Sequence, residues 1–317
     1  MTKPKISFLA FFLLWAELQG WKIPTFHIQV CIFLEEFYLN GRTGLLMLPR
    51  GHSKSSILDV FNAWVIYCWP NTQILHQGTT DADAYKCSKG TRDVLERHPL
   101  CIGNPNVAIR QGEIERWFVE GTPDVRYGTM LAKGILSGVT GHRAHFIQND
   151  DVETPQTTAN PEQREKLPKK LSEQTHIAIP GAKRLWIGTP HTHDSLYEKI
   201  KKQRKVSKLI LKMFENEKRV EDSVKGQKVL LDFEPIHAFS GIGVGAKYLR
   251  KGENYECRKL KNAWEVTFLE SNYIVDFYSK GIWEERFTPE EMEFRREECK
   301  TLNEWDSQYQ MHAKQIG

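Results

Sequence analysis

The chain has 317 residues, a length that suits one large domain or two domains of modest size. Hydrophobic residues make up 40% of it and charged residues 26%, so neither intrinsic disorder nor a collagen-like repeat describes the whole chain. The formal net charge of +4 is mild, and it permits an anionic partner without requiring one.

The cysteines are scattered along the chain, with no CxxC pair and no zinc-finger spacing. In a chain of this length they predict reduced, intracellular thiols and no disulfide framework. They are Cys31, Cys68, Cys87, Cys101, Cys257 and Cys299.

The N-terminus resembles a secretion signal, because Lys3 and Lys5 precede an apolar run over residues 8–16. The run is much shorter than the roughly 20 residues that a membrane span needs. Trp15 and Glu17 also stand where a signal peptide would carry small residues for cleavage. We therefore expect a buried N-terminal helix that packs on the core, and no membrane association.

Apolar segments that end in polar or glycine-containing loops alternate with helical patterns along the first two thirds of the chain. This order is typical of a parallel α/β sheet, whose ligands bind beyond the carboxyl ends of its strands. We expect the functional site along that edge. The expected strands cover residues 45–48, 74–75, 144–148 and 185–187, and the expected helices run from about residue 54 to before Pro70, through residues 94–95 to Pro99, and onward from the capping box of Ser195 and Glu198.

The character of the chain changes near residue 205. Six basic residues lie between residues 199 and 208, either as a contact for DNA phosphates or as a solvated helix face. Beyond them we expect a strand at residues 229–233, a glycine-rich patch at 241–245 and a polar helix from about Pro289. The sequence thus predicts a core over residues 1–205 and a smaller subdomain over 206–317.

Residues 48–55 lie between a predicted strand and a predicted helix, which is the context of a phosphate-binding loop. Backbone N–H groups at a helix start, with the positive end of the helix dipole, suit a polyphosphate. In such a loop Lys54 would reach the outer phosphates and the Ser55 hydroxyl would bind Mg²⁺. The candidate nucleotide-binding residues are Arg50, Gly51, His52, Ser53, Lys54 and Ser55.

The loop departs from the pattern GxxxxGK[ST] at two positions. Leu48 stands where the first glycine belongs, and Ser53 stands immediately before the lysine. A left-handed backbone at Ser53 would cost roughly 1–2 kcal/mol relative to glycine. The alternative interpretation of this segment is a turn that carries a solvated lysine.

An apolar segment at residues 145–148 ends in the carboxylates Asp150, Asp151 and Glu153. Charges placed so close together repel one another unless a cation compensates them, and Mg²⁺ prefers hard oxygen ligands of this kind. Asp150 is the candidate ligand of Mg²⁺, and a neighbouring carboxylate can polarise the water that attacks a γ-phosphate. The alternative is that Asp150 and Asp151 only cap the next helix.

Four segments taken together, in order and with plausible spacing, resemble phage large terminase subunits of the type found in short-tailed podoviruses. They cover residues 50–55, 138–144, 150–153 and 188–190, and the resemblance extends over roughly residues 8–200. It implies a RecA-like P-loop ATPase of the ASCE type, with a mainly parallel sheet flanked by helices and a small C-terminal lid or linker subdomain. It further implies ATP and Mg²⁺ as cofactors and the packaging of viral DNA as the task.

The resemblance also implies roles for single residues. Arg50 matches the arginine of the terminase Walker A loop, and Gln29 resembles the glutamine that reads adenine. Asp150 matches the Walker B aspartate, Asp151 occupies the slot of the catalytic glutamate, and Glu153 is a rival for that role. The coupling motif, which senses the γ-phosphate and relays its loss to the parts that grip DNA, is matched by Gly188, Thr189 and Pro190.

Some positions differ from the family pattern. Ser53 replaces a glycine, which puts the full hydrolysis rate in doubt. Thr140 stands where many terminases carry an arginine finger that acts on a neighbouring subunit, so Arg143 is the candidate substitute. Such a finger contributes roughly 10³–10⁵ in rate.

The C-terminal segment at residues 305–310 resembles the stretch that closes the ATPase region of terminases, before their RNase H-like nuclease domain begins. No second set of acidic strands follows, so we do not expect this chain to cut DNA. The partners that the resemblance implies are double-stranded DNA, the portal protein of the procapsid, the small terminase subunit and further copies of the chain in a ring, all in the host cytoplasm.

Two rival functions remain open at this point. One is a helicase-like or DNA-repair ATPase of the same fold, and the other is a catalytically impaired remnant that only binds nucleotide or DNA. A binuclear zinc site at His191, His193 and Asp194 is disfavoured, because Ser195 and Leu196 stand where the HxHxDH pattern needs Asp and His.

Overall fold

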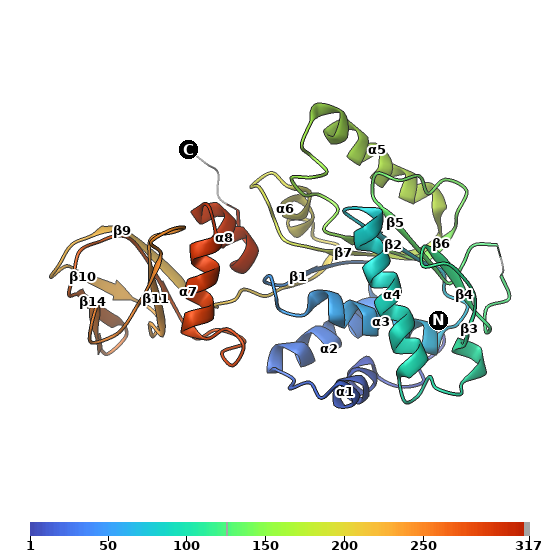
Figure 1. The fold of residues 1–317 in the computed structure, drawn as a ribbon, viewed down its shortest axis with the longest axis horizontal. Coiled ribbons are helices and arrows are strands. Elements are labelled where there is room, and N and C mark those ends of the chain that lie inside the picture. Colours follow the sequence, from blue (N-terminus) through green and yellow to red (C-terminus); the bar gives the residue numbers. More distant parts are fainter. Residues whose placement is uncertain (125, 314–317) are drawn as a thin grey trace. The chain divides into compact units, whose positions relative to one another are not determined.

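Figure 1 shows the computed structural model of the protein, which describes residues 1–124 and 126–313. The chain forms two compact units. The first unit comprises Met1–Met47 and Ser53–Ile210, and the second comprises Leu48–His52 and the chain from Leu211 onward. The division after Ile210 lies five residues beyond the predicted one, because residues 207–210 form a strand that pairs with the sheet of the first unit.

The first unit is built on an eight-stranded sheet with the order β3-β4-β5-β2-β6-β7-β1-β8. All pairs from β5 to β8 are parallel, and β3 and β4 add an antiparallel edge. The predicted α/β fold with a mainly parallel sheet is therefore confirmed. The strands are β1 (Thr43–Met47), β2 (Ile74–Gly78), β3 (Ile109–Gly112), β4 (Arg116–Val119), β5 (Met130–Gly134), β6 (Ala144–Asp150), β7 (Ala178–Ile187) and β8 (Ser207–Ile210).

Helices flank this sheet, with α1 and α2 below it and α5 and α6 above it in the view of Figure 1. One strand, β7, separates β1 from β6, which is the arrangement expected of an ASCE-type ATPase. The helices of the first unit are α1 (Phe8–Gln19), α2 (Thr25–Asn40), α3 (Lys54–Cys68), α4 (Asp81–Arg97), α5 (Pro161–Ile177) and α6 (Leu196–Lys201), with a short 3-10 helix at Pro105–Val107.

The expected buried N-terminal helix is confirmed as α1. Phe8, Phe11 and Phe12 are fully buried, because the apolar run forms a helix that packs on α2 and α3. The Phe8 ring meets the Phe61 ring edge-on, with 5.0 Å between their centroids. Within the described part of the chain, none of the helices has the length and apolar character needed to cross a membrane.

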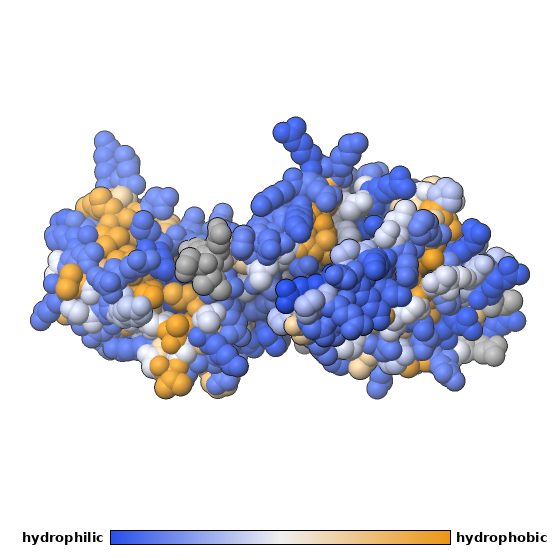
Figure 2. Space-filling model, turned by 90° about the horizontal axis from the view of Figure 1, so that it is seen from above, coloured by the Kyte–Doolittle hydropathy of each residue, from blue (hydrophilic) through white to orange (hydrophobic). Residues whose placement is uncertain are grey.

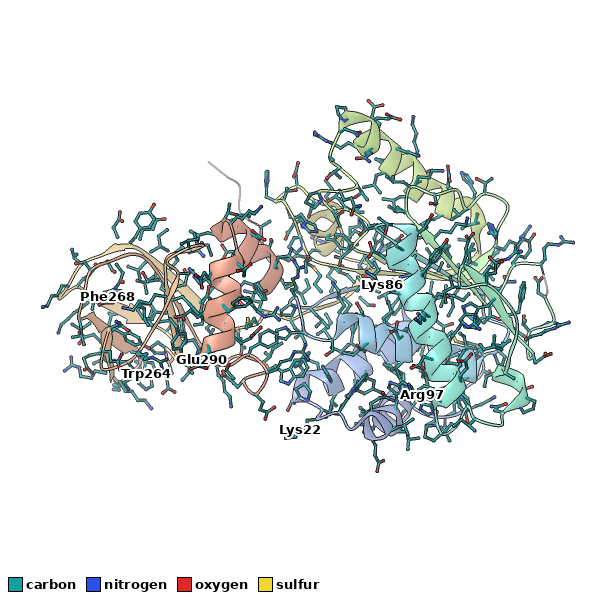
Figure 3. The ribbon with its side chains drawn as sticks, in the orientation of Figure 1. Lys22, Lys86, Arg97, Trp264, Phe268 and Glu290 are labelled. Atoms are coloured by element: carbon teal, nitrogen blue, oxygen red, sulfur yellow. The ribbon has the colours of Figure 1, made fainter. Side chains whose placement is uncertain are left out.

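The second unit is mostly antiparallel β-structure, of which the sequence predicted only one strand and the helix that begins near Pro289. One sheet has the order β12-β11-β15-β9 and the other β10-β14-β13. Figure 3 shows Trp264 and Phe268 on β14, and Phe268 is fully buried in the core between the strands. The elements are β9 (Glu217–Ser223), β10 (Lys228–Leu231), β11 (His237–Ser240), β12 (Lys247–Leu249), β13 (Tyr255–Lys259), β14 (Trp264–Phe268), β15 (Asn272–Tyr278), α7 (Pro289–Glu298) and α8 (Leu302–Tyr309).

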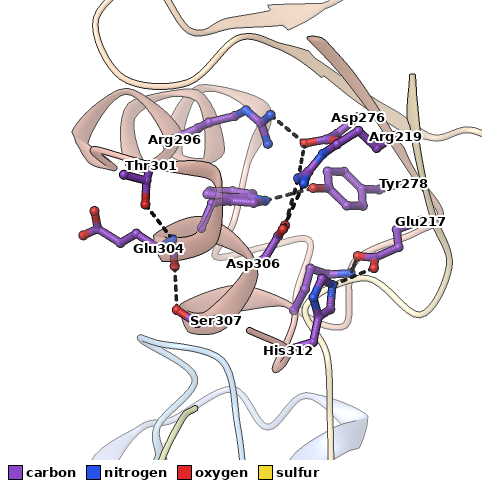
Figure 4. A network of polar contacts seen from close by, with 12 residues as sticks. Glu217, Arg219, Asp276, Tyr278, Arg296, Thr301, Glu304, Asp306, Ser307 and His312 are labelled. Carbon is purple, nitrogen blue, oxygen red and sulfur yellow. Dashed lines mark hydrogen bonds and ion pairs between the residues drawn. The ribbon is translucent and has the colours of Figure 1, made fainter. Parts of the chain in front are cut away.

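A buried ionic network ties the two helices of the second unit to its sheet (Figure 4). Arg219 on β9 bonds Asp276 on β15 at 2.7 Å and Asp306 on α8 at 2.9 Å. Arg296 on α7 bonds Asp276 at 2.6 Å. Two guanidinium groups thus neutralise two carboxylates, which is the condition under which charges can be kept in a protein interior.

Candidate active site

The carboxyl ends of β1, β6 and β7 lie along one edge of the sheet, because these neighbouring strands are parallel. β1 leads to the loop before α3, β6 ends at Asp150, and β7 ends at Ile187 just before the coupling motif. The topology therefore brings the start of α3, the acidic strand end and the coupling motif to the same edge of the first unit.

An ion pair joins the first and second of these segments. The Nζ of Lys54 donates to Oδ2 of Asp151 at 3.2 Å, across 97 positions of the sequence. The two side chains are 15% and 36% exposed. The interpretation of this segment as a turn with a solvated lysine is therefore wrong, since the ammonium group is largely buried and engaged by a carboxylate.

The backbone of Asp151 is held in a left-handed conformation, with φ of 47°. Its N–H donates to the carbonyl oxygen of Ile187 at 2.8 Å, and its own carbonyl accepts the hydroxyl of Thr79 at 2.7 Å. The N–H of Thr189 donates to Oδ1 of Asp151 at 3.3 Å. Neighbouring strand ends thus fix a conformation that is unfavourable for a side chain, and they aim the carboxylate at both Lys54 and the coupling motif.

Asp150 ends β6 beside Asp151. Burial and the adjacent charge of Asp151 raise the pKa of Asp150 to about 7, while Lys54 opposes the shift. The Nε2 of His76 lies 3.9 Å from the Oδ2 of Asp150. Burial lowers the pKa of His76 to about 4, so at neutral pH the imidazole is neutral and supplies no compensating charge.

These groups fit a divalent cation held jointly with a nucleotide. A carboxyl group whose ionisation is opposed by burial and by a like charge becomes fully ionised when a cation binds it. Mg²⁺ takes few protein ligands and completes its shell with water and phosphate oxygens. Among the described residues, no group of three His, Cys, Asp or Glu side chains could hold a metal ion by itself.

Helix α3 begins at Lys54 without a side-chain cap. Its N-cap residue Ser53 makes no capping hydrogen bond through its side chain and has φ of 68°. The left-handed backbone that the sequence suggested at this position is therefore present. The N–H groups of the first turn and the positive end of the dipole of α3 favour an anion, and the exposed Ser55 lies in this turn.

The preceding loop residues group with the second unit. The N–H of Arg50 donates to the carbonyl oxygen of Gln308 at 2.9 Å. The His52 ring stacks on the Phe287 ring, with 4.3 Å between centroids. Arg50 and Gly51 are exposed, whereas His52 is buried.

The Glu153 side chain stabilises the start of α6 in this conformation. Its Oε1 accepts the N–H of Leu196 at 2.7 Å, which satisfies a donor at the first turn of α6. Ser195 caps the same helix, because its hydroxyl accepts the N–H of Glu198 at 3.2 Å. Between the two carboxylates that the sequence left as rivals, the structure brings Asp151 to Lys54 and directs Glu153 to α6.

The coupling motif packs tightly against this carboxylate. A Cβ atom on Gly188 would lie 2.8 Å from Oδ1 of Asp151 and 2.7 Å from the ring of Tyr197, so only glycine fits. Thr189 and Pro190 are buried. The hydroxyl of Tyr197 accepts the N–H of Val152 at 3.1 Å, which ties α6 to the chain just after the acidic pair.

Arg143 and Gln29 are the remaining predicted site residues. Arg143 immediately precedes β6, whose seven residues span roughly 23 Å up to Asp150, so it belongs to the opposite edge of the sheet. The exposed Gln29 lies near the start of α2, and its side chain makes no hydrogen bond or ion pair with any described residue. The role of Gln29 stays a prediction.

Sequence reasoning missed three residues that shape the site, namely Thr79, His76 and Tyr197. Thr79 directly follows β2, of which the sequence predicted residues 74–75, and its position after a strand of the parallel sheet was the available signal. His76 and Tyr197 lie in apolar surroundings that carry no pattern, so only the tertiary structure reveals their contacts with the acidic pair.

Comparison with known proteins gives one relative by sequence. No family model matches the chain. The large terminase subunit of Enterobacteria phage T3 is 27% identical over 231 residues, which are 71% of this chain and 39% of that protein. The chain therefore spans about two fifths of the length of the relative that it matches.

Two solved structures also align with the chain. The ATPase domain of the Thermus phage P74-26 large terminase, solved as a mutant, has 16% identity and a TM-score of 0.40 over 62% of this chain and 84% of that one. The large terminase of a thermophilic bacteriophage, in complex with ATP-gamma-S, has 10% identity and a TM-score of 0.37 over 61% of this chain and 45% of that one. The resemblance to phage large terminase subunits, which four motifs predicted, is confirmed by the sequence relative from phage T3.

Proposed function

We propose that this chain is the ATPase part of a large terminase, and that it hydrolyses ATP to drive double-stranded viral DNA into a procapsid. The observation that carries the proposal is the ion pair between Lys54 and Asp151. It places a lysine at a helix N-terminus and an acidic strand end on the same edge of a parallel sheet, which is the layout that a P-loop ATPase needs.

In this proposal the first turn of α3 binds the phosphates of ATP. Lys54 contacts the outer phosphates, and Ser55 and Asp150 supply oxygen ligands for Mg²⁺. When bound, Mg²⁺ neutralises charge on the phosphate oxygens. Phosphate oxygens compete with Asp151 for the ammonium group of Lys54, so nucleotide binding breaks the ion pair and frees the Asp151 carboxylate.

Asp151 then serves as the group that orients and polarises the attacking water. Its backbone is fixed by Thr79, and its Oδ1 accepts the N–H of Thr189. A change in the charge facing Asp151 therefore alters the hydrogen bond between Asp151 and the coupling motif. This contact supports the role of Gly188, Thr189 and Pro190 in relaying phosphate release.

The remaining roles require partners. Arg143 at the opposite edge of the sheet can act only on the site of another copy of the chain, which agrees with a ring. Gln29 is proposed to read adenine, and Arg50, Gly51, His52 and Ser53 to complete the phosphate-binding loop. The phage T3 relative is named as a large terminase subunit, which supports a terminase role. With that role we propose the portal protein and the small terminase subunit as partners and the host cytoplasm as the location.

ATP hydrolysis by the full chain tests the proposal. We expect Lys54→Ala and Asp151→Asn each to lower kcat by about 10²-fold or more, because both act on the transferred phosphoryl group or its water. Lys86→Ala is the matched control, since Lys86 is 79% exposed on α4 (Figure 3) and should keep the full rate. Equal, near-zero rates in the wild type and the variants would contradict the proposal and indicate a binding remnant.

A second measurement separates the motor from a helicase-like ATPase. Duplex DNA should stimulate hydrolysis without strand displacement, and the chain should associate with procapsids that carry a portal. Strand displacement of a forked duplex in the absence of procapsids would favour the helicase instead.

A further inference from the structure

A cavity of about 350 Å³ opens at the amino-terminal edge of the sheet in the first unit, opposite to the candidate active site. Its walls are the starts of β1 and β7, the middle of β6 and the last turn of α5. The side chains relevant to its chemistry are Arg42, Thr43, Ile147, Thr175, Lys183 and Arg184.

Three cations line this cavity, and no acidic side chain is among the described residues of its lining. Lys183 is already engaged, because its Nζ donates to the carbonyl oxygen of Gly41 at 2.5 Å and lies 5.7 Å from the centre of the Tyr38 ring. The guanidinium groups of Arg42 and Arg184 make no hydrogen bond or ion pair with any described residue. The two residues are joined through their backbones, because the backbone N–H of Arg184 donates to the carbonyl oxygen of Arg42 at 2.9 Å.

The position of Arg184 is unfavourable without an anion. Its side chain is partly buried, and burial together with the charge of Arg42 lowers its pKa. Taking a charged group out of water without a partner costs free energy. The C-terminal end of α5 offers partial compensation, but a helix end carries only about half an elementary charge, against two full charges on the arginines.

The arrangement of donors matches a tetrahedral oxyanion. Guanidinium groups present two parallel N–H donors each, which suit the oxygens of a phosphate group. Thr43 at the start of β1 and Thr175 in the last turn of α5 also line the cavity, and each carries a hydroxyl group that can donate. The apolar side chain of Ile147 also lines the cavity, and a less polar wall strengthens electrostatic interactions beside it.

We propose that this cavity binds a phosphate group through Arg42 and Arg184. The phosphate comes either from inorganic phosphate or from the backbone of duplex DNA. The proposal concerns the opposite edge of the sheet from Lys54, so it does not depend on ATP hydrolysis.

Calorimetric titration of inorganic phosphate tests the proposal. The full chain carrying Lys54→Ala is used, so that the phosphate-binding loop contributes little. We expect an added Arg184→Gln to weaken phosphate binding about tenfold and Arg42→Gln to weaken it about threefold, because each removes charged donors. Arg97→Gln is the control, since Arg97 pairs with Asp93 on the surface of α4 and should change nothing (Figure 3).

Thermal unfolding in chloride buffer distinguishes binding from a purely structural role. Arg184→Gln removes an unpaired, partly buried charge, so the variant should melt at the same or a higher temperature than its parent without phosphate. A lower melting temperature together with unchanged phosphate affinity would overturn the proposal.

Fluorescence anisotropy with a duplex of about 30 base pairs identifies the source of the phosphate. If DNA supplies it, Arg184→Gln weakens duplex binding and lowers the salt slope by about 1, because one phosphate contact is lost. If duplex binding is unchanged while phosphate binding is lost, the ligand is inorganic phosphate. If Arg184→Gln and Arg42→Gln bind both inorganic phosphate and duplex DNA as well as the control Arg97→Gln does, the cavity is not a phosphate site.

Discussion

Two residues at the candidate active site adopt left-handed backbone conformations that side chains seldom take. Ser53 has φ of 68° at the start of α3, and Asp151 has φ of 47° at the end of β6. Each conformation costs roughly 1–2 kcal/mol and persists only where surrounding contacts impose it. At Asp151 those contacts come from Thr79 and Ile187, and the strained residue faces Lys54.

Replacing Ser53 with glycine should stabilise the protein. Glycine relieves the left-handed strain, and its extra freedom in the unfolded chain offsets part of that gain, leaving about 0.5–1 kcal/mol. Urea denaturation measures the difference in the free energy of unfolding. Ser56→Gly is the matched control, because the same change inside α3 should destabilise by about the same amount.

Asp150 makes the stability of the protein without nucleotide depend on pH. Its pKa rises from the ordinary value of 3.8 to about 7 on folding, so the folded state retains a proton that the unfolded state releases. This contribution to stability is present below pH 4 and is lost as the pH rises through 7. Asp150→Asn should therefore raise the free energy of unfolding at pH 8, on the order of 2 kcal/mol, while abolishing Mg²⁺-dependent hydrolysis.

Denaturation midpoints at pH 5 and pH 8 check this effect. The gain from Asp150→Asn should be larger at pH 8 than at pH 5. An equal change at both values would show that the aspartate is ionised throughout this range.

At the scale of elements, the start of α6 links the acidic strand end to the coupling motif. Glu153 accepts the N–H of Leu196, and Tyr197 accepts the N–H of Val152. The two bonds run in opposite directions between the same segments. The position of α6 therefore depends on the backbone that follows Asp151, which gives phosphate release a route to the rest of the first unit.

Glu153→Gln tests the division of labour between the two carboxylates. The amide oxygen of glutamine still accepts the Leu196 N–H but loses the charge at the helix start, so we expect a loss of about 0.5–1 kcal/mol in stability and a kcat within about twofold of the wild type. Thermal unfolding and steady-state hydrolysis measure the two effects. A fall in kcat as large as that of Asp151→Asn would instead make Glu153 the group that activates water.

At the scale of the whole molecule, the two units have separate cores and different kinds of sheet. The first contains a mainly parallel sheet and the proposed ATPase chemistry, and the second contains antiparallel sheets held to α7 and α8 by buried ion pairs. Figure 2 shows apolar residues on the surface of the second unit, where Leu230 and Val244 are among the exposed side chains. The chain passes from one unit to the other after Met47, after His52 and after Ile210, so the segment Leu48–His52 belongs to the second unit.

Arg219→Ala should destabilise the second unit selectively. It leaves Asp306 without its buried cationic partner and leaves Asp276 with Arg296 alone, which costs about 3–5 kcal/mol. Differential scanning calorimetry should show a lower melting temperature for one transition only. Arg258→Ala is the control, because Arg258 is 68% exposed in its pair with Glu265 and contributes less than about 1 kcal/mol.

The sequence by itself determined the class of the first unit and the segments of its site. The alternation of apolar strands and helices predicted a parallel sheet, and parallel strands place their carboxyl ends at one edge, so the sequence also predicted that Lys54, Asp151 and Thr189 lie near one another. The N-terminal helix was predictable from its own pattern. Its apolar run is too short to span a membrane, so it was expected to pack on the core. These features follow from local patterns and from the direction of strands.

Only the tertiary structure decided which side chains touch and how the second unit folds. Glu153 and Asp151 are close in sequence and alike in chemistry, and the left-handed backbone at Asp151 sends one to α6 and the other to Lys54. Arg219 pairs with Asp276 on β15 and with Asp306 on α8, which lie 57 and 87 positions further along the chain. No local sequence pattern predicts contacts over such distances. The partly buried charge of Arg184 likewise arises from the packing of α5 on the sheet, because burial is a property of the folded chain.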